Sequence, residues 1–140
     1  MNTGKKPMYQ VKRVGDAANT MPAMQKHPDA IPNADNATIS LDKLSGYSLN
    51  QEHEKGGHKA RRFRVALGFD ESHAQEIADQ VKRLLPAHPA KLGDLDKHGQ
   101  RYSVDLSLTG PAGSATVRSA WIVAKEGDPP RLVSIYVKGL

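Results

Sequence analysis

The residues best suited to chemistry gather in one segment of the chain, residues 47–69, which reads YSLNQEHEKGGHKARRFRVALGF. Around the expected start of a helix, the segment brings together two histidines, two adjacent glycines and a cluster of cations: His53, His58, Gly56, Gly57, Lys59, Arg61, Arg62 and Arg64. Cations and free backbone N–H groups at a glycine-opened helix start bind anions such as phosphate. A histidine that titrates near neutral pH is the usual acid or base for cleaving RNA without a metal ion. The segment therefore indicates a protein that handles nucleic acid.

A second set of polar side chains lies on three predicted strands, residues 101–108, 114–124 and 131–138. We expect helices to cover the face of Val133, Ile135 and Val137, because alternation leaves one face of a sheet buried and one in water. The opposite face then collects hydroxyls and cations: Thr116, Arg118, Ser134, Tyr136 and Lys138, with Arg101 and Ser103 from the first strand. Arginine can hold a phosphate at two points, and tyrosine or serine hydroxyls can bind it or move a proton. The alternative is an ordinary hydrated face of a half-buried sheet.

Several other kinds of site are excluded by what the sequence lacks. The absence of cysteine rules out disulfides, thiolate zinc sites and cysteine nucleophiles. The six histidines form no HExxH motif, and the glycine motifs of nucleotide-binding loops and serine hydrolases are absent. We therefore expect neither a metal ion nor a cofactor.

Length and charge set the general class of the protein. A chain of 140 residues with 38% hydrophobic residues is expected to form about one domain with a modest core. The formal net charge of +5 favours polyanionic partners, although many domains of such charge bind none. No apolar run approaches the roughly 20 residues that span a bilayer, and the start of the chain lacks the apolar stretch of a signal peptide. If the protein is exported, something outside these residues exports it.

Helices followed by strands are expected to position these residues. Residues 1–35 are rich in proline and asparagine without a regular period, which predicts a linker or entry segment ahead of a domain over residues 36–140. Capping residues and apolar spacing predict three helices and then a loop: helices at residues 40–44, 58–67 and 71–85, and the loop at 86–99. The strands form an antiparallel meander, so the fold class is α+β, with the N-terminal helices packed on one face of the sheet. Trp121 shares the apolar side of its strand, and we expect it in the core.

Four segments taken together resemble a bacterial domain family. They are LDKL with GYSL (residues 41–44 and 46–49), GHKA with Phe63 and LGF (57–60 and 67–69), GQRY (99–102), and VRSAWI followed by PRLV and Tyr136 (117–122 and 130–133). Members of the family often sit at the extreme C-terminus of large secreted proteins, including filamentous-haemagglutinin-like and contact-dependent inhibition effectors. The resemblance covers residues 32–138 and implies a polymorphic-toxin domain that is cut free and delivered into a neighbouring bacterium.

Helices followed by a curved antiparallel sheet also look like the barnase/EndoU/colicin/RelE (BECR) group of ribonucleases. Members of that group cleave RNA without a metal ion and use varied sets of His, Arg, Lys, Tyr, Ser and Thr. The resemblance matches Lys59, Arg118 and Tyr136 to family positions, but the chain has no obvious Glu–Arg–His trio like that of barnase. The identities of the acid and the base therefore stay open.

The resemblance and the residues together give a leading hypothesis, an antibacterial ribonuclease toxin that acts on RNA, with transfer RNA expected. Lys59 and Arg118 would hold phosphate, and His58 or Tyr136 would transfer the proton. Four further residues would bind the substrate: Thr116, Ser134, Arg62 and Lys138. A producer of such a toxin needs a cognate immunity protein, which should be acidic to complement the basic face. The toxin would be secreted as the C-terminal part of a larger effector and act in the cytoplasm of the target cell.

Two other functions stay open. The main alternative is a non-catalytic RNA- or protein-binding module that uses the same basic face, and a third possibility is a phage- or secretion-associated structural domain. His58 would then be an exposed helix-start residue, and Lys59 would lie along the surface.

Overall fold

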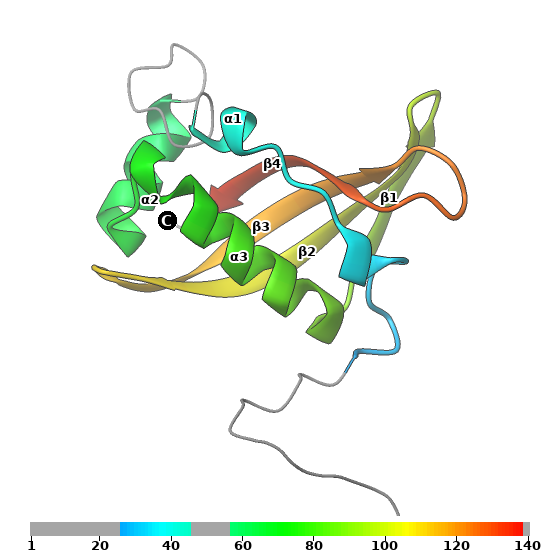
Figure 1. Cartoon of the computed structure of the whole chain (residues 1–140), viewed down its shortest axis with the longest axis horizontal. Coiled ribbons are helices and arrows are strands. Elements are labelled where there is room, and N and C mark those ends of the chain that lie inside the picture. The colour runs from blue at the N-terminus through cyan, green and yellow to red at the C-terminus, as the bar shows by residue number, and fades with distance from the viewer. Residues whose placement is uncertain (1–25, 46–56, 139–140) are drawn as a thin grey trace, which may run out of the picture.

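The computed structural model of the chain describes residues 26–45 and 57–138, and at Gly57 and His58 it describes the backbone alone. Four strands form one antiparallel sheet in the order β1-β2-β3-β4 (Figure 1). They are β1 (Lys91–Asp96), β2 (Gly99–Gly110), β3 (Gly113–Val123) and β4 (Arg131–Val137). Helices ahead of an antiparallel meander confirm the expected α+β class.

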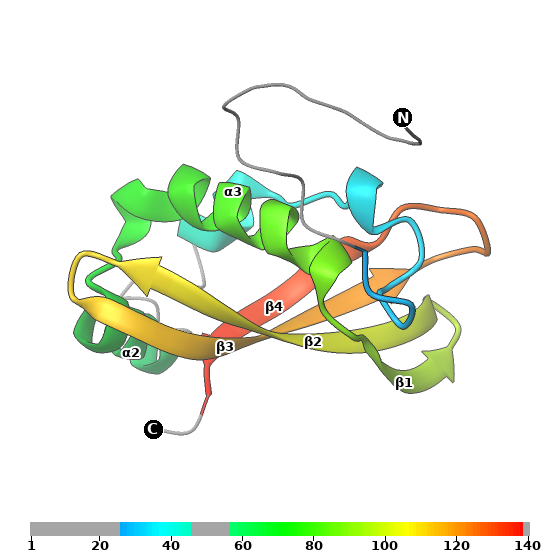
Figure 2. The same cartoon turned by 90° about the horizontal axis from the view of Figure 1, so that it is seen from below.

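The helices lie on two sides of this sheet. Helix α3 (Ala74–Leu84) crosses one face, on the same side as the N-terminal segment that carries α1 (Leu41–Lys43) (Figure 2). Helix α2 (Gly57–Leu67) lies on the other side, beside the end of the β2–β3 hairpin. Short 3₁₀ turns complete the helical part: Ala34–Asn36, Glu71–His73 and Leu85–Ala87. The predicted helix positions are confirmed. Of the α-helices in the described part of the chain, α1 and α3 lie over the expected face, whereas α2 does not.

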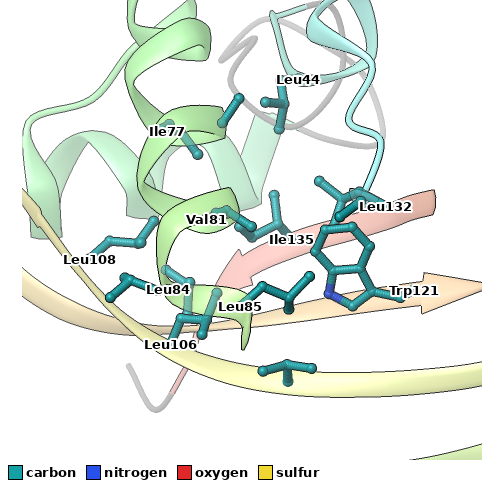
Figure 3. Close-up of a cluster of buried hydrophobic side chains, with 14 of the residues drawn as sticks. Leu44, Ile77, Val81, Leu84, Leu85, Leu106, Leu108, Trp121, Leu132 and Ile135 are labelled. Carbon is teal, nitrogen blue, oxygen red and sulfur yellow. The ribbon is translucent and has the colours of Figure 1, made fainter. Parts of the chain in front are cut away.

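Helix α3 forms the main layer over the sheet. Its buried residues recur every three or four positions, as the sequence predicts: Ala74, Ile77, Ala78, Val81 and Leu84. They belong to one core with Leu106 of β2, Trp121 of β3 and Ile135 of β4 (Figure 3). The expected core position of Trp121 is confirmed.

Part of the segment assigned to the linker packs against this core. Ile31 and Ala34 are buried in the hydrophobic cluster. The Ala90 N–H donates to the Asp29 carbonyl oxygen at 2.8 Å, which ties the segment to the start of β1. The packed domain therefore includes residues ahead of residue 36. Residues 1–25 and 46–56 lie outside the described part of the chain, so the structure does not test the predictions made for them.

The prediction of a loop over residues 86–99 is wrong, because β1 lies within it. Leu92 and Leu95 are three residues apart, so the sequence shows no two-residue alternation there. A bulge accounts for this spacing, since the pairing shifts between Leu92 opposite Tyr102 and Leu95 opposite Gln100. The two leucines are 67% and 75% exposed.

The predicted burial of Val133 is also wrong. Val133 is 37% exposed, and Leu132 is buried instead. The register between β3 and β4 shifts between Ala120 and Trp121, and Trp121 pairs with Leu132. Val133 is therefore the extra residue of a β-bulge, while the rest of the predicted apolar stripe of β4 is buried as expected.

Among the described residues, one polar side chain is buried inside the core. Ser119 is fully buried, and its hydroxyl donates to the Val104 carbonyl oxygen at 2.8 Å. The same hydroxyl accepts the indole N–H of Trp121 at 2.8 Å. A buried indole N–H requires such a partner, so Ser119 holds the central aromatic residue of the core in one orientation.

Replacing Ser119 by alanine should lower the free energy of unfolding by about 1–3 kcal/mol, because the buried indole N–H loses its partner. Ser107→Ala, at an exposed serine of β2, is the matched control and should change stability by less than about 0.5 kcal/mol. Urea unfolding followed by the fluorescence of the single tryptophan measures both variants. Equal stabilities would contradict the role given to Ser119.

Candidate anion-binding site

The register of the sheet brings three polar side chains into a row on the face opposite α3. Asp105 on β2 pairs with Arg118 on β3, and Arg118 pairs with Tyr136 on β4. The chain neighbours of all three are buried, as alternation requires. The polar face predicted from the sequence is therefore present, and this row is its centre.

Asp105 holds two cations of this face. The Arg118 Nε donates to Asp105 Oδ1 at 2.9 Å, and the Arg118 Nη2 reaches Oδ2 at 3.3 Å. The Lys138 Nζ donates to the same Oδ2 at 2.7 Å. Two-point contact between a guanidinium and a carboxylate restricts the orientation of both groups. Asp105 therefore acts as an anchor that sets the positions of Arg118 and Lys138.

The same contacts determine the protonation state of the anchor. Hydrogen bonds from Arg118 and then from Lys138 lower the pKa of Asp105 to about 2. Asp105 in turn raises the pKa of Arg118 above its ordinary value. Asp105 and Arg118 are therefore both charged at neutral pH. A carboxylate with so low a pKa is a poor proton acceptor, which excludes Asp105 as an efficient general base.

A third cation reaches the row from α2. The Lys59 Nζ lies 4.9 Å from the centre of the Tyr136 ring, within the range of a cation–π contact. Lys59 and Tyr136 are both half-buried, so this contact is partly shielded from water. Among the described contacts of this row, three cations, Lys59, Arg118 and Lys138, thus accompany the one carboxylate of Asp105.

The docking of α2 explains how Lys59 arrives there. Phe63 and Leu67 of this helix are buried in the core. The Leu67 carbonyl oxygen accepts the Ala112 N–H at 3.0 Å, in the turn between β2 and β3. A side chain at Gly110 would place its Cβ 2.2 Å from that oxygen, so glycine is needed for this close approach. The C-terminal end of α2 is fixed on the hairpin, and its first turn lies over β4.

The structure brings together four of the residues singled out in the sequence: Lys59, Arg118, Tyr136 and Lys138. Ser134 lies on the same face, half-buried opposite Ala120. Thr116 is exposed, and its carbonyl oxygen accepts the Lys138 N–H at 2.8 Å. Arg62 is half-buried on α2. The side chain of His58 is outside the described part of the chain, so its role stays a prediction.

Asp105 is the member of this site that sequence reasoning missed. Its place on the hydrated face follows from alternation with Val104 and Leu106. Its pairing with Arg118 follows from the centre of the hairpin turn, because the turn at Pro111 and Ala112 sets Gly110 opposite Gly113 and Asp105 opposite Arg118. The proline and glycines between the two predicted strands were the signal that could have revealed the pair.

A shallow pocket adjoins this row on the side of β1. Its volume is about 250 Å³, and its lining comprises Pro89, Ala90, Lys91, Ser103, Asp105 and Arg118. It combines an apolar wall with hydroxyl, ammonium, guanidinium and carboxylate groups.

Two negative findings apply to the described residues only. Within residues 26–45 and 57–138, no three or more His, Cys, Asp or Glu side chains come close enough to hold a metal ion. No helix in the same part of the chain is long and apolar enough to cross a membrane.

The Asp105 anchor should make stability depend on pH in a defined range. Its folded pKa of about 2 lies below the ordinary value of 3.8, so its contribution is complete above about pH 4 and is lost as the pH falls toward 2. The side chain is 36% exposed, and after allowing for screening by water we expect about 1 kcal/mol. Asp105→Asn should therefore destabilise the protein by about that amount near pH 6 and by progressively less toward about pH 2.5.

Urea unfolding of both proteins across that pH range measures the difference. Asp94→Asn, on the exposed strand β1, is the matched control and should follow the unsubstituted protein throughout. A destabilisation by Asp105→Asn that stays constant with pH would show that the effect is not electrostatic.

Comparison with curated protein sequences finds no match. The model of a protein family matches residues 30–139, which span the packed domain from Ile31 to the end of β4. Because this match covers well over half of the chain, the protein belongs to that family, which is described as a domain of unknown function (DUF6883).

Proposed function

We propose that this protein is a metal-independent ribonuclease that acts as an antibacterial toxin, and that the polar face of the sheet is its active site. The observation that carries the proposal is the gathering of Lys59, Arg118 and Lys138 around Tyr136 on an open surface. An excess of positive charge beside a hydroxyl suits the cleavage of a phosphodiester, because negative charge on the phosphate oxygens must be stabilised as the reaction proceeds.

In this proposal, Lys59 and Arg118 bind the phosphate. A guanidinium has five N–H donors, and the two atoms that contact Asp105 leave further N–H groups of Arg118 for a ligand. Asp105 keeps the guanidinium in place before the substrate arrives, which lowers the cost of orienting it at the moment of reaction. Lys59 reaches the same face from α2, with its Nζ 4.9 Å from the centre of the Tyr136 ring.

In this proposal, two residues transfer protons: His58 is the base and Tyr136 is the acid. The 2′-oxygen of the ribose bonds to phosphorus while the bond from phosphorus to the 5′-oxygen breaks. The proton of the 2′-hydroxyl passes to a base, for which His58 is the candidate because its backbone lies in the first turn of α2 beside Lys59. The Tyr136 hydroxyl donates its proton to the departing 5′-oxygen. The products are a 2′,3′-cyclic phosphate and a free 5′-hydroxyl.

The biological setting is supported by the sequence resemblance to C-terminal toxin domains. We infer delivery from a larger secreted effector into the cytoplasm of a neighbouring bacterium, with transfer RNA as the expected substrate. A cognate immunity protein with an acidic surface would cover the cationic face.

One observation favours a second candidate function, a non-catalytic RNA-binding module. Asp105 already engages Arg118 and Lys138, and its low pKa makes it unsuitable as a base. A face of this kind can bind phosphates through its cations alone. The two candidates differ in what they require of the Tyr136 hydroxyl.

Purified protein should cleave bacterial RNA in the presence of EDTA. Lys59→Ala and Arg118→Ala should each reduce the rate by about a hundredfold or more, because each removes a group that stabilises the charged transition state. Tyr136→Phe should reduce the rate by a similar factor and leave RNA affinity nearly unchanged, because it removes only the proton donor. Arg101→Ala is the matched control and should leave the rate nearly unchanged. Arg101, on β2, is ion-paired as Arg118 is, with its Nε 2.8 Å from Asp96 Oδ2, but it is not part of the row.

Cleavage is read on gels of total RNA, affinity by fluorescence anisotropy, and folding of each variant by thermal unfolding. Intact RNA with correctly folded, unsubstituted protein would overturn the catalytic proposal. If that protein nevertheless bound RNA in the anisotropy measurement, the result would favour the binding module. Cleavage that survives all three substitutions would place the active site elsewhere.

A further inference from the structure

The pocket beside Arg118 lies on the side away from Tyr136. Arg118 sits on β3, with Asp105 of β2 on one side and Tyr136 of β4 on the other. The pocket is lined by Ser103 and Asp105 of β2 and by residues 89–91 at the start of β1. Since neighbouring strands are about 4.8 Å apart, a ligand that touches both Tyr136 and the pocket must span roughly 10 Å. A lone phosphate cannot span that distance, whereas a nucleotide can.

The wall of this pocket is formed in advance. Ala90 packs against the hydrophobic core, and its N–H donates to the Asp29 carbonyl oxygen at 2.8 Å. Two residues earlier in the chain, His88 Nδ1 lies 2.8 Å from the Leu84 carbonyl oxygen at the end of α3. Contacts on both sides of Pro89 therefore fix the segment that forms the wall.

The chemistry of the lining suits a flat heterocycle with polar edges. Pro89 and Ala90 offer apolar surface for the face of a ring. The Ser103 hydroxyl can donate and accept, Arg118 and Lys91 can donate, and Asp105 can accept. The volume of about 250 Å³ is below the range of about 300–1,000 Å³ for drug-sized ligands, so the pocket suits one ring system and not two stacked nucleotides.

We propose that this pocket is a nucleobase subsite, which receives the base of the nucleotide whose phosphate lies between Lys59 and Arg118. The assignment of the phosphate rests on the proposed function. A base stacked in a duplex cannot enter a pocket on the protein surface, so the substrate class is RNA with unpaired nucleotides, either single-stranded or in loops.

Binding of mononucleotides tests the subsite without relying on cleavage. We would titrate ¹⁵N-labelled protein with the four ribonucleoside 5′-monophosphates and, in parallel, with ribose 5-phosphate, and follow backbone amide shifts. At least one nucleotide should bind about tenfold more tightly than ribose 5-phosphate, because it adds a stacked base. The additional shifts should centre on Ala90, Lys91 and Ser103.

Substitutions at Ser103 then locate the effect. Ser103→Phe should remove the advantage of the nucleotide over ribose 5-phosphate by filling the pocket. Ser103→Ala keeps the space and removes only the hydroxyl, so it should reduce that advantage severalfold. It replaces the phenylalanine variant in the test if that variant does not fold. Ser107→Phe is the matched control, because Ser107 is exposed on the same strand and the same face but does not line the pocket.

Equal affinities for nucleotides and ribose 5-phosphate would overturn the subsite, and so would base-dependent shifts at a different surface. A Ser103→Phe protein that folds and still prefers nucleotides would overturn it as well. Tight, base-dependent binding in this pocket by a protein that leaves RNA intact would overturn the ribonuclease proposal alone and support the subsite.

Discussion

The pairing of β2 with β3 is the constraint on which the rest of the structure depends. The two strands are paired without interruption from Gln100 opposite Val123 to Gly110 opposite Gly113. This register directs one set of side chains toward α3 and the other toward the polar face, and a slip of one residue would exchange the two sets. Both long helices dock on this hairpin, α3 on its apolar face and α2 at its turn.

The bulge in β4 reconciles two demands on one strand. Leu132 must reach the core, where it pairs with Trp121, and Tyr136 must point to the opposite face beside Arg118. Both residues have even numbers, so strict alternation would place them on the same face. The extra residue, Val133, shifts the alternation by one position and satisfies both demands. The position of Tyr136 in the site is thus a consequence of how the core is packed at the other end of the strand.

Local patterns predicted those parts of the fold that depend on near neighbours. The apolar stripe of α3, the alternation in β2 and the burial of Trp121 all follow from spacing within one element, and the structure confirms them. The predictions failed for β1 and Val133, because a bulge breaks the two-residue period that reveals a strand.

The candidate site could be predicted only in part, because its geometry depends on contacts between elements. Alternation placed Arg118 and Tyr136 on one face, but it could not show that Asp105 would hold Arg118 and Lys138. Nor could it show that α2 would cross to that face and bring Lys59 over Tyr136. These contacts follow from turn length and helix docking, which a pattern within a single segment does not encode.

The dispersal of the site along the chain has a consequence for an unfolded molecule. Lys59, Asp105, Arg118 and Tyr136 come from four separate elements, and no two of them are neighbours in the sequence. An extended chain therefore carries no anion site at all, and the site appears only when β4 has paired with β3 and α2 has docked. Because the sequence has no cysteine, that assembly follows the same course in oxidising and reducing surroundings. If the proposed function holds, activity is tied to completed folding, and a chain threaded through a narrow passage would be inert until it refolds.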